Sequence, residues 1–151
     1  MSLKLGSGCW NLDFPGKLGT KTILVVAVAL VDLDNRVLIS KRPKGKPMEG
    51  LWEFPGGKVN ENELPETALV RELNEELGID VSESCLAPLT FSSHVYTSFH
   101  LLMPVFACRV WRGIITPQEN QELNWVSPLK LSDFPMPAAD SSIVAFLRDF
   151  L

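Results

Sequence analysis

The feature that most constrains the fold is one amphipathic helix whose ends and buried face can both be located in the sequence. Pro65 suits the first position of a helix, where its missing amide hydrogen is not needed, and Gly78 suits the residue just past the end. The leucines between them recur at four-residue spacing, at Leu69, Leu73 and Leu77. This spacing predicts a helix over residues 65–77 with one buried stripe.

Extended segments before and after this helix indicate the rest of the architecture. The apolar run Ile23–Val31 predicts a buried strand, and it is too short to span a bilayer. After a turn at Asp32–Asn35, the alternation of Val37–Arg42 predicts a second strand paired with the first. The further expected elements are an extended piece at Trp52–Phe54 with a sharp turn at Pro55-Gly56-Gly57, a hairpin of Leu86–Tyr96 and Phe99–Val110, a strand at Trp125-Val126 and a helix at Ser141–Leu151. Strands interleaved with two helices indicate a layered α/β domain.

The composition predicts one folded domain and excludes some classes of partner. The 151 residues are 46% hydrophobic, which is enough to bury a core. We expect residues 1–20, which contain four glycines, to form a flexible extension and residues 21–151 to form the domain. With 14 basic and 18 acidic residues, the chain has no basic field for duplex nucleic acid. No apolar run is long enough to predict a membrane segment.

The cysteines and histidines argue against a zinc site. Cys9, Cys85 and Cys108 contain no C-x-x-C pair, and only His94 and His100 could supplement them. Three cysteines in this arrangement fit a reducing compartment, so we expect the protein to be cytoplasmic.

The expected helix carries a group of acidic residues. Glu72 and Glu76 lie one turn apart, and Glu75 lies beside them, so three carboxylates share one face. Like charges at this distance repel, and a hard divalent cation resolves the repulsion. Ligands that are all oxygen favour Mg²⁺ or Mn²⁺. The alternative is a solvated acidic helix face that binds no ion.

These residues form part of a longer pattern. Gly57, Glu63 and the segment RELNEELGI at residues 71–79 match every specified position of G-x5-E-x7-R-E-U-x-E-E-x-G-U, where U is aliphatic. The pattern resembles the Nudix box, and WEFPGGK at residues 52–58 is similar to the MutT branch of that family. The resemblance implies the Nudix fold, an α/β/α sandwich with a mixed β-sheet. It also implies hydrolysis of a nucleoside diphosphate linked to another moiety.

The resemblance gives each matching residue a role. The catalytic positions are Glu63, Arg71, Glu72, Glu75 and Glu76. The last three glutamates match metal ligands, and the Gly56 carbonyl would add another oxygen. Arg71 would hold a box glutamate by a charge-assisted hydrogen bond, while Glu63 would support the site without ligating. Lys58 matches a lysine near the phosphates, and the alternative is an exposed loop residue.

Four residues outside the box are further candidates. Glu119 is in register with a distal metal-binding glutamate of the MutT branch, or is a solvated loop acid. Arg42 matches a contact to the nucleotide phosphate, or is an ordinary cation at a strand end. Tyr96 could stack on a base or pack as a structural aromatic. Asp140 matches the position of an asparagine that reads the purine edge, and its alternative role is to cap the last helix.

The function that we expect is therefore a Mg²⁺-dependent nucleoside triphosphate pyrophosphohydrolase. The resemblance to the MutT branch implies an oxidised purine nucleotide such as 8-oxo-dGTP as the substrate, and the carboxylate of Asp140 could accept from N1–H and the amino group of oxoguanine. The same acceptor would suit the amino group of cytosine, so hydrolysis of CTP or another pyrimidine nucleotide is the alternative. A noncatalytic nucleotide- or protein-binding Nudix module is the alternative from another class. We expect a monomer or a small homo-oligomer.

Overall fold

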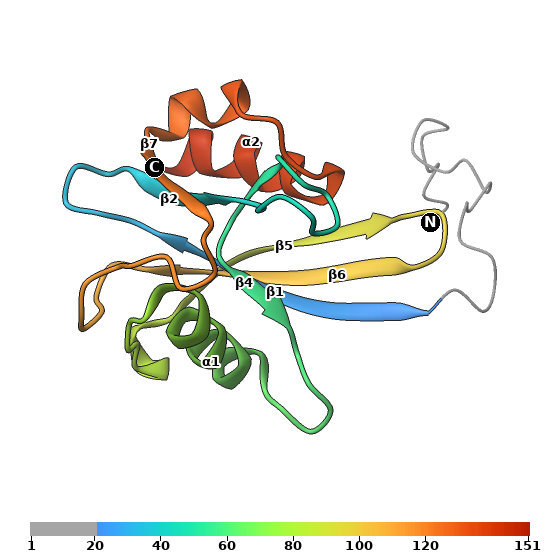
Figure 1. The fold of residues 1–151 in the computed structure, drawn as a ribbon, viewed down its shortest axis with the longest axis horizontal. Coiled ribbons are helices and arrows are strands. Elements are labelled where there is room, and N and C mark those ends of the chain that lie inside the picture. Colours follow the sequence, from blue (N-terminus) through green and yellow to red (C-terminus); the bar gives the residue numbers. More distant parts are fainter. Residues whose placement is uncertain (1–20) are drawn as a thin grey trace, which may run out of the picture.

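The computed structural model describes residues 21–151, which form three layers (Figure 1). Helix α1 (Pro65–Leu77) covers one side of the strands, and helix α2 (Ser141–Phe150) covers the other. This arrangement confirms the predicted α/β sandwich. The expected extension at residues 1–20 lies outside the described residues. Within residues 21–151, no helix combines the length and apolar character that crossing a membrane requires.

The central sheet contains four strands in the order β4-β1-β6-β5. Strand β1 (Thr22–Leu30) pairs parallel with β6 (His100–Cys108) and antiparallel with β4 (Gly56–Lys58), so the sheet is mixed, as predicted. Strands β5 (Ala87–Val95) and β6 form the expected antiparallel hairpin. Strands β1 and β6 each lie between two partners and form the interior of the sheet.

A second, three-stranded antiparallel sheet has the order β3-β2-β7. Its strands are β2 (Val37–Lys41), β3 (Trp52–Glu53) and β7 (Glu122–Val126). The predicted pairing of the second strand with the first is therefore wrong. Among the described residues, only the isolated bridge between Val31 and Val37 joins the two segments. A strand has two edges, and β4 and β6 already occupy both edges of β1, so the chain continues into the other sheet.

The predicted sharp turn at Pro55-Gly56-Gly57 is only partly present. The bend is confined to Pro55, and the two glycines form β4, which pairs with β1. Gly56 has a φ of 153°, and a Cβ at this position would collide with the backbone carbonyl of Val26. Glycine is required here because no side chain fits between the two strands.

The core is divided between the two faces of β1. Its side chains alternate, so Val26, Val28 and Leu30 face α1 while Ala27 and Ala29 face α2. The predicted helical stripe is confirmed, since Leu69, Leu73 and Leu77 are fully buried. Ile143 and Leu147 bury α2 on the opposite face. The strand pattern therefore fixes both helices against one sheet.

The ends of α1 follow the sequence. Pro65 is its first residue, and the preceding Leu64 makes no side-chain cap. Gly78 adopts a left-handed conformation with a φ of 67°, and its amide donates to the carbonyl of Asn74. These two ends confine α1 to Pro65–Leu77, and its glutamate Glu72 lies against Gly57 of β4.

Candidate active site

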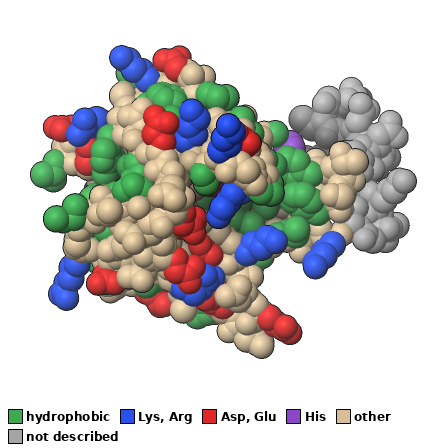
Figure 2. All heavy atoms as spheres, in the orientation of Figure 1, with side chains coloured by type: hydrophobic (Ala, Val, Ile, Leu, Met, Phe, Trp, Pro, Cys, Tyr) green, Lys and Arg blue, Asp and Glu red, His purple; other side chains and the backbone are tan. Residues whose placement is uncertain are grey.

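A pocket lies where α1, β1, β3 and β4 meet. It is a pocket of about 590 Å³, and its walls include Glu72 and Glu76 of α1, Glu53 of β3 and Asp140 at the start of α2. The loop after β2 also contributes to the walls. In the space-filling view, acidic and basic side chains gather side by side near the middle of the face shown (Figure 2). The pocket thus connects the acidic face of α1 with the segment that precedes α2.

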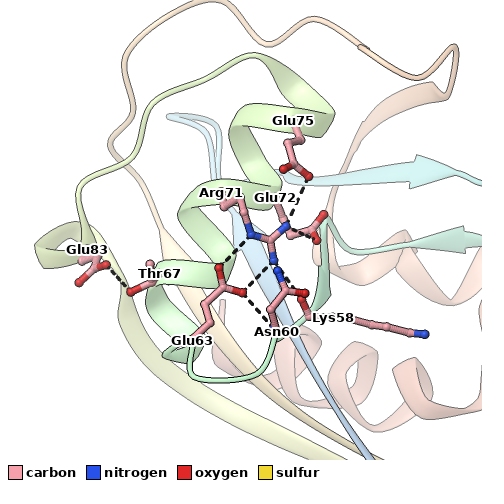
Figure 3. Close-up of polar contacts among 8 residues, drawn as sticks. All are labelled: Lys58, Asn60, Glu63, Thr67, Arg71, Glu72, Glu75 and Glu83. Carbon is pink, nitrogen blue, oxygen red and sulfur yellow. Dashed lines mark hydrogen bonds and ion pairs between the residues drawn. The ribbon is translucent and has the colours of Figure 1, made fainter.

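Arg71 organises the acidic residues of α1. Its guanidinium forms a bidentate pair with Glu63, with two N–O distances of 2.9 Å, and its Nη1 donates to Glu72 at 3.0 Å and Glu75 at 3.4 Å (Figure 3). It also donates to the backbone carbonyl of Lys58 at 3.1 Å. One arginine therefore connects three carboxylates of α1 and its approach segment to strand β4.

Glu63 is held in a single arrangement. The hydrogen bonds from Arg71, followed by one from the amide of Asn60 at 3.0 Å, lower the pKa of Glu63 to about 2. With both oxygens occupied by donors, this side chain is placed to support the helix. The supporting role that the box position implies for Glu63 stays a prediction.

Glu76 has a different environment from Glu63. Burial, followed by the neighbouring charges of Glu72, Glu53 and Glu119, raises the pKa of Glu76 to about 8. The amide of Gly56 donates to it at 3.4 Å, and no cationic side chain of the described residues forms an ion pair with it. Glu76 is thus a carboxyl group among other carboxylates without a compensating charge.

Glu72 lies against strand β4 because Gly57 has no side chain. A Cβ at Gly57 would collide with the carboxylate of Glu72. Burial raises the pKa of Glu72, while the hydrogen bond from Arg71 opposes that shift. The glycine of the box is therefore required for the close approach of helix and strand.

These carboxylates fit a hard divalent cation. The donors are all oxygen, and Glu76 is buried among like charges that a cation would neutralise. The residues that would hold it are Glu72, Glu75 and Glu76, with the backbone carbonyl of Gly56. Within residues 21–151, no three acidic, cysteine or histidine side chains already converge on one point. Arg71 instead engages Glu72 and Glu75, so ion binding requires these side chains to reorient.

Glu119 reaches this pocket from a distant part of the chain. It lies in the exposed loop before β7 and lines the pocket with Glu72 and Glu76. Its charge contributes to the raised pKa values of Glu53, Glu72 and Glu76. The structure thus brings together the α1 carboxylates and the loop acid that the sequence separates by more than forty positions.

Arg42 lies in the pocket wall just after β2. Its Nε donates to Glu53 at 3.0 Å, and its Nη1 donates to the carbonyl of Pro47 at 3.4 Å. Sequence reasoning missed Glu53 as a pocket residue. Burial raises the pKa of Glu53, and the charge and hydrogen bond of Arg42 oppose this rise. The only signal for Glu53 in the sequence was a charged residue between two aromatic residues, Trp52 and Phe54, both of which are buried.

Asp140 is a buried carboxyl group, with 5% of its surface exposed. Burial, followed by the charge of Glu53, raises the pKa of Asp140 to about 7, and Arg42 opposes this shift. Asp140 occupies the first position before α2, but its side chain makes no cap hydrogen bond. The alternative role as a helix cap therefore has no support in the geometry.

Tyr96 and Lys58 also line the pocket. The hydroxyl of Tyr96 accepts from the amide of Ala139 at 3.3 Å, and its ring already stacks on Phe99 with centroids 4.9 Å apart. The exposed side chain of Lys58 points away from the Arg71 network (Figure 3). The Nε2 of His100 forms a hydrogen bond with the hydroxyl of Ser93, which fits a structural role for His100.

The fold and this helix-borne acidic face together define a Nudix-type hydrolase domain. The family model described as NUDIX domain matches residues 26–146 of the chain. The chain belongs to this family. Members of the family generally need divalent metal cations, which agrees with the donor set described above.

Two named relatives and one solved structure indicate to which branch of the Nudix family the chain belongs. An 8-oxo-dGTP diphosphatase of Proteus vulgaris is 39% identical over 99 residues, which cover 66% of this chain and 87% of that protein. A CTP pyrophosphohydrolase of Escherichia coli K12 is 37% identical over 122 residues, which cover 80% of this chain and 87% of that protein. A MutT structure from work on Aliivibrio salmonicida and Vibrio cholerae aligns at 33% identity and a TM-score of 0.71, covering 86% of this chain and 100% of that one. The chain is thus a Nudix pyrophosphohydrolase of the MutT-like branch.

Proposed function

We propose that this protein hydrolyses nucleoside triphosphates to the monophosphate and pyrophosphate with Mg²⁺, and that oxidised purine nucleotides such as 8-oxo-dGTP are its preferred substrates. The observation that carries the proposal is one pocket that contains both the acidic face of α1 and the buried Asp140. A triphosphate can lie with its phosphates at the first and its base at the second. Removing such nucleotides would sanitise the nucleotide pool and prevent mutation.

The phosphate end of the pocket combines acidic and basic groups. When bound, Mg²⁺ (or Mn²⁺) would polarise the phosphorus, lower the pKa of a water molecule and stabilise the leaving pyrophosphate. The carboxylates of Glu72, Glu75 and Glu76 are the residues that would hold it, with Glu119 contributing from the loop. One of the α1 glutamates accepts the proton of the attacking water. No covalent nucleophile is needed, because phosphoryl transfer depends mainly on positioning and electrostatics.

Two basic side chains contact the phosphates in this proposal. Arg42 keeps its guanidinium in the pocket wall through Glu53 and can donate its remaining N–H groups to a phosphate oxygen. Lys58 is exposed on β4 and is long enough to reach a phosphate as a point charge. Arg71 acts indirectly, because its donors hold the helix glutamates in place.

Asp140 recognises the base in this proposal. As a carboxylate it accepts from the N1–H and amino group of oxoguanine, and as a carboxylic acid it can donate to a carbonyl oxygen. A pKa of about 7 leaves both forms available near neutral pH. Tyr96 forms the adjoining wall and contacts the base by its edge or remaining face, because Phe99 covers part of the ring.

Hydrolysis of CTP is the second candidate. It is supported by the similarity to a CTP pyrophosphohydrolase over 80% of the chain, and by an acceptor at Asp140 that suits the amino group of cytosine. The two candidates share the phosphate chemistry and differ only in the base.

A nucleotide panel tests the proposal. Pyrophosphate release should require Mg²⁺, and kcat/KM for 8-oxo-dGTP should exceed the values for dGTP and CTP. A higher kcat/KM for CTP would select the second candidate. Binding of nucleotide without turnover, at any concentration of Mg²⁺ or Mn²⁺, would identify a noncatalytic Nudix module.

The remaining aspects of the proposal concern the cellular setting. We propose a cytoplasmic enzyme, a view supported by the free thiols of Cys85 and Cys108. The net charge of −4 supports a small nucleotide as the partner in preference to duplex nucleic acid. A monomer or a small homo-oligomer is our proposal for the assembly, and light scattering of the purified protein tests it.

A further inference from the structure

Gln121 is a buried polar residue that the chemistry described above does not use. It stands between the exposed loop that carries Glu119 and strand β7, and only 8% of its surface is exposed. Buried amide side chains are stable only where both ends find partners. The partners of Gln121 therefore show what it connects.

Both ends of the Gln121 amide are bonded to residues of the acidic pocket. Its Nε2 donates to the backbone carbonyl of Glu76 at 2.7 Å, and its Oε1 accepts from the backbone amide of Glu119 at 2.8 Å. The first partner belongs to the last turn of α1, where carbonyls lack a partner within the helix. One side chain thus joins the backbones of two acidic residues that are far apart in sequence.

The surrounding loop reinforces this connection. The segment between β6 and β7, drawn in orange, passes the end of α1 (Figure 1), and its amides at Thr116 and Gln118 donate to the carbonyls of Leu77 and Glu76. Asn120, between Glu119 and Gln121, adopts a left-handed conformation with a φ of 58°. Asparagine tolerates this conformation better than most residues. The backbone therefore turns sharply at the point where Glu119 has to face the pocket.

Holding Glu119 in this place opposes electrostatic repulsion. Glu119 lines the same pocket as Glu53, Glu72 and Glu76, and its negative charge adds to burial in raising the pKa of all three. Like charges in one pocket favour an outward position for an exposed loop acid. A hydrogen-bonded connection to α1 restricts that outward movement before any ion arrives. Pre-positioned ligands lose less conformational freedom when they bind an ion.

We propose that Gln121 is a positioning residue that fixes Glu119 against the end of α1, so that the loop carboxylate joins those of the helix in binding the divalent cation. The inference rests on the proposed function, since it takes Glu119 as a metal-binding residue. Among the described residues that line the pocket, Glu119 is present and Gln121 is not. Gln121 acts through the backbone of Glu119.

Replacement of Gln121 by methionine is the direct test. Methionine has a similar length but neither donates nor accepts the two hydrogen bonds, and the carbonyl of Glu76 keeps the amide of Gln118 as a partner. We expect the Mg²⁺ concentration for half-maximal activity to rise about tenfold, in line with the loss of a buried hydrogen bond. KM for the nucleotide should change little. The Gln118→Met variant is the matched control, because that exposed side chain donates only within its own loop, to Thr116.

A double-variant comparison shows whether Gln121 acts through Glu119. If it does, Gln121→Met should change the Mg²⁺ requirement of a Glu119→Gln protein by less than about twofold. Independent effects that multiply in the double variant would overturn the proposal. Should Gln121→Met fail to fold, Gln121→Asn serves instead, because its shorter side chain cannot span both partners.

A measurement without turnover separates this inference from the proposed function. Exchange of the Glu119 amide hydrogen, followed by NMR, should accelerate in Gln121→Met and remain unchanged in Gln118→Met. Mn²⁺ titration of the nucleotide-free protein should show weaker binding only in the first variant. Unchanged exchange and unchanged Mn²⁺ affinity would overturn the role of Gln121. An inactive wild-type protein would instead overturn the proposed function.

Discussion

The charged residues of the site are of two kinds: a carboxyl group without a cationic partner, and an arginine that binds several carboxylates. Glu76 is buried among like charges, whereas Arg71 compensates Glu63, Glu72 and Glu75. Replacing the carboxyl group of Glu76 should therefore affect catalysis more than folding. Replacing the forked guanidinium of Arg71 should change the orientation of several carboxylates together.

The first prediction concerns Glu76. Glu76→Gln keeps the shape of the side chain and removes its charge, so turnover at saturating Mg²⁺ should fall roughly 100-fold or more. The melting temperature should stay equal or rise, because one member of a repelling group is gone. Steady-state kinetics and thermal unfolding measure the two effects. Near-normal turnover would show that Glu76 does not participate in the chemistry.

The second prediction concerns Arg71. Lysine keeps the charge but cannot form the bidentate pair with Glu63 while also reaching Glu72. In Arg71→Lys we expect kcat to fall about tenfold with little change in KM, since orientation of the glutamates matters most in the transition state. Arg148→Lys is the control, because within residues 21–151 Arg148 pairs only with the adjacent Asp149 at the surface. Equal kcat in both variants would contradict the prediction.

The third prediction concerns Asp140 and pH. The pKa of Asp140 is raised from 3.8 to about 7 in the folded protein, so the unfolded chain releases this proton first. Stability is therefore lost as pH rises from about 4 to 7, and Asp140→Asn removes this loss. The variant should be more stable than the wild type at pH 8, by up to about 4 kcal/mol, and similar to it near pH 4.

Denaturant unfolding across this pH range measures the difference, with the exposed Asp133→Asn as the control. A stability difference that does not vary with pH would contradict the titration of Asp140. The same Asp140→Asn protein should change the ratio of kcat/KM between 8-oxo-dGTP and CTP by about tenfold or more, because asparagine can donate where aspartate accepts. An unchanged ratio would place recognition of the base elsewhere.

At the scale of elements, α1 has a weak start and a strong end. The C-terminus has its left-handed glycine, but Leu64 precedes Pro65 with 66% of its surface exposed and no cap to offer. This element is positioned by its buried leucines and by Arg71. The start of α1 is therefore a place where stability can be added without touching the pocket.

The fourth prediction follows from this geometry. Leu64 has an extended backbone with a φ of −76° and a ψ of 150°, which suits an N-terminal cap. Leu64→Ser should raise the free energy of unfolding by about 0.5–2 kcal/mol, because its hydroxyl can accept from an unpaired amide of the first turn. Leu64→Ala is the control that changes exposure without adding an acceptor. Equal stability of the two variants, measured by denaturant unfolding, would contradict the prediction.

At the scale of the whole molecule, the pocket draws its walls from elements that belong to both sheets and both helices. The acidic residues meet there without an ion, and the pKa of Glu76, raised to about 8, means that ionising this carboxyl group is harder in the folded protein than in the unfolded chain. Binding of a cation to the folded state alone should therefore stabilise the entire domain.

The fifth prediction states this coupling. Mg²⁺ at about 100 times its dissociation constant should stabilise the fold by about 2.7 kcal/mol, seen as a higher melting temperature. NaCl at equal ionic strength is the control, because screening alone gives only part of the effect. Glu76→Gln should reduce the shift. The same shift in this variant and the wild type would show that the cation binds elsewhere.

Local sequence patterns were enough to locate most of the helices and strands and the Nudix box. Pro65, Gly78 and the leucine stripe predicted α1, because capping and periodicity are local properties. The spacing of the glutamates placed three carboxylates on one helical face, and the match to the Nudix box was confirmed by the family of the chain. The sheet was predicted as mixed, and the hairpin of β5 and β6 was located correctly.

Which distant residues meet depends on long-range packing. β2 pairs with β7 in the second sheet because β4 and β6 already occupy both edges of β1, and no local pattern of Val37–Arg42 contains this information. Burial of Asp140, the ion pair between Arg42 and Glu53, and the connection of Gln121 to α1 likewise arise from contacts between separated segments. A local pattern specifies the face that a side chain takes, whereas long-range packing specifies the partner it meets there.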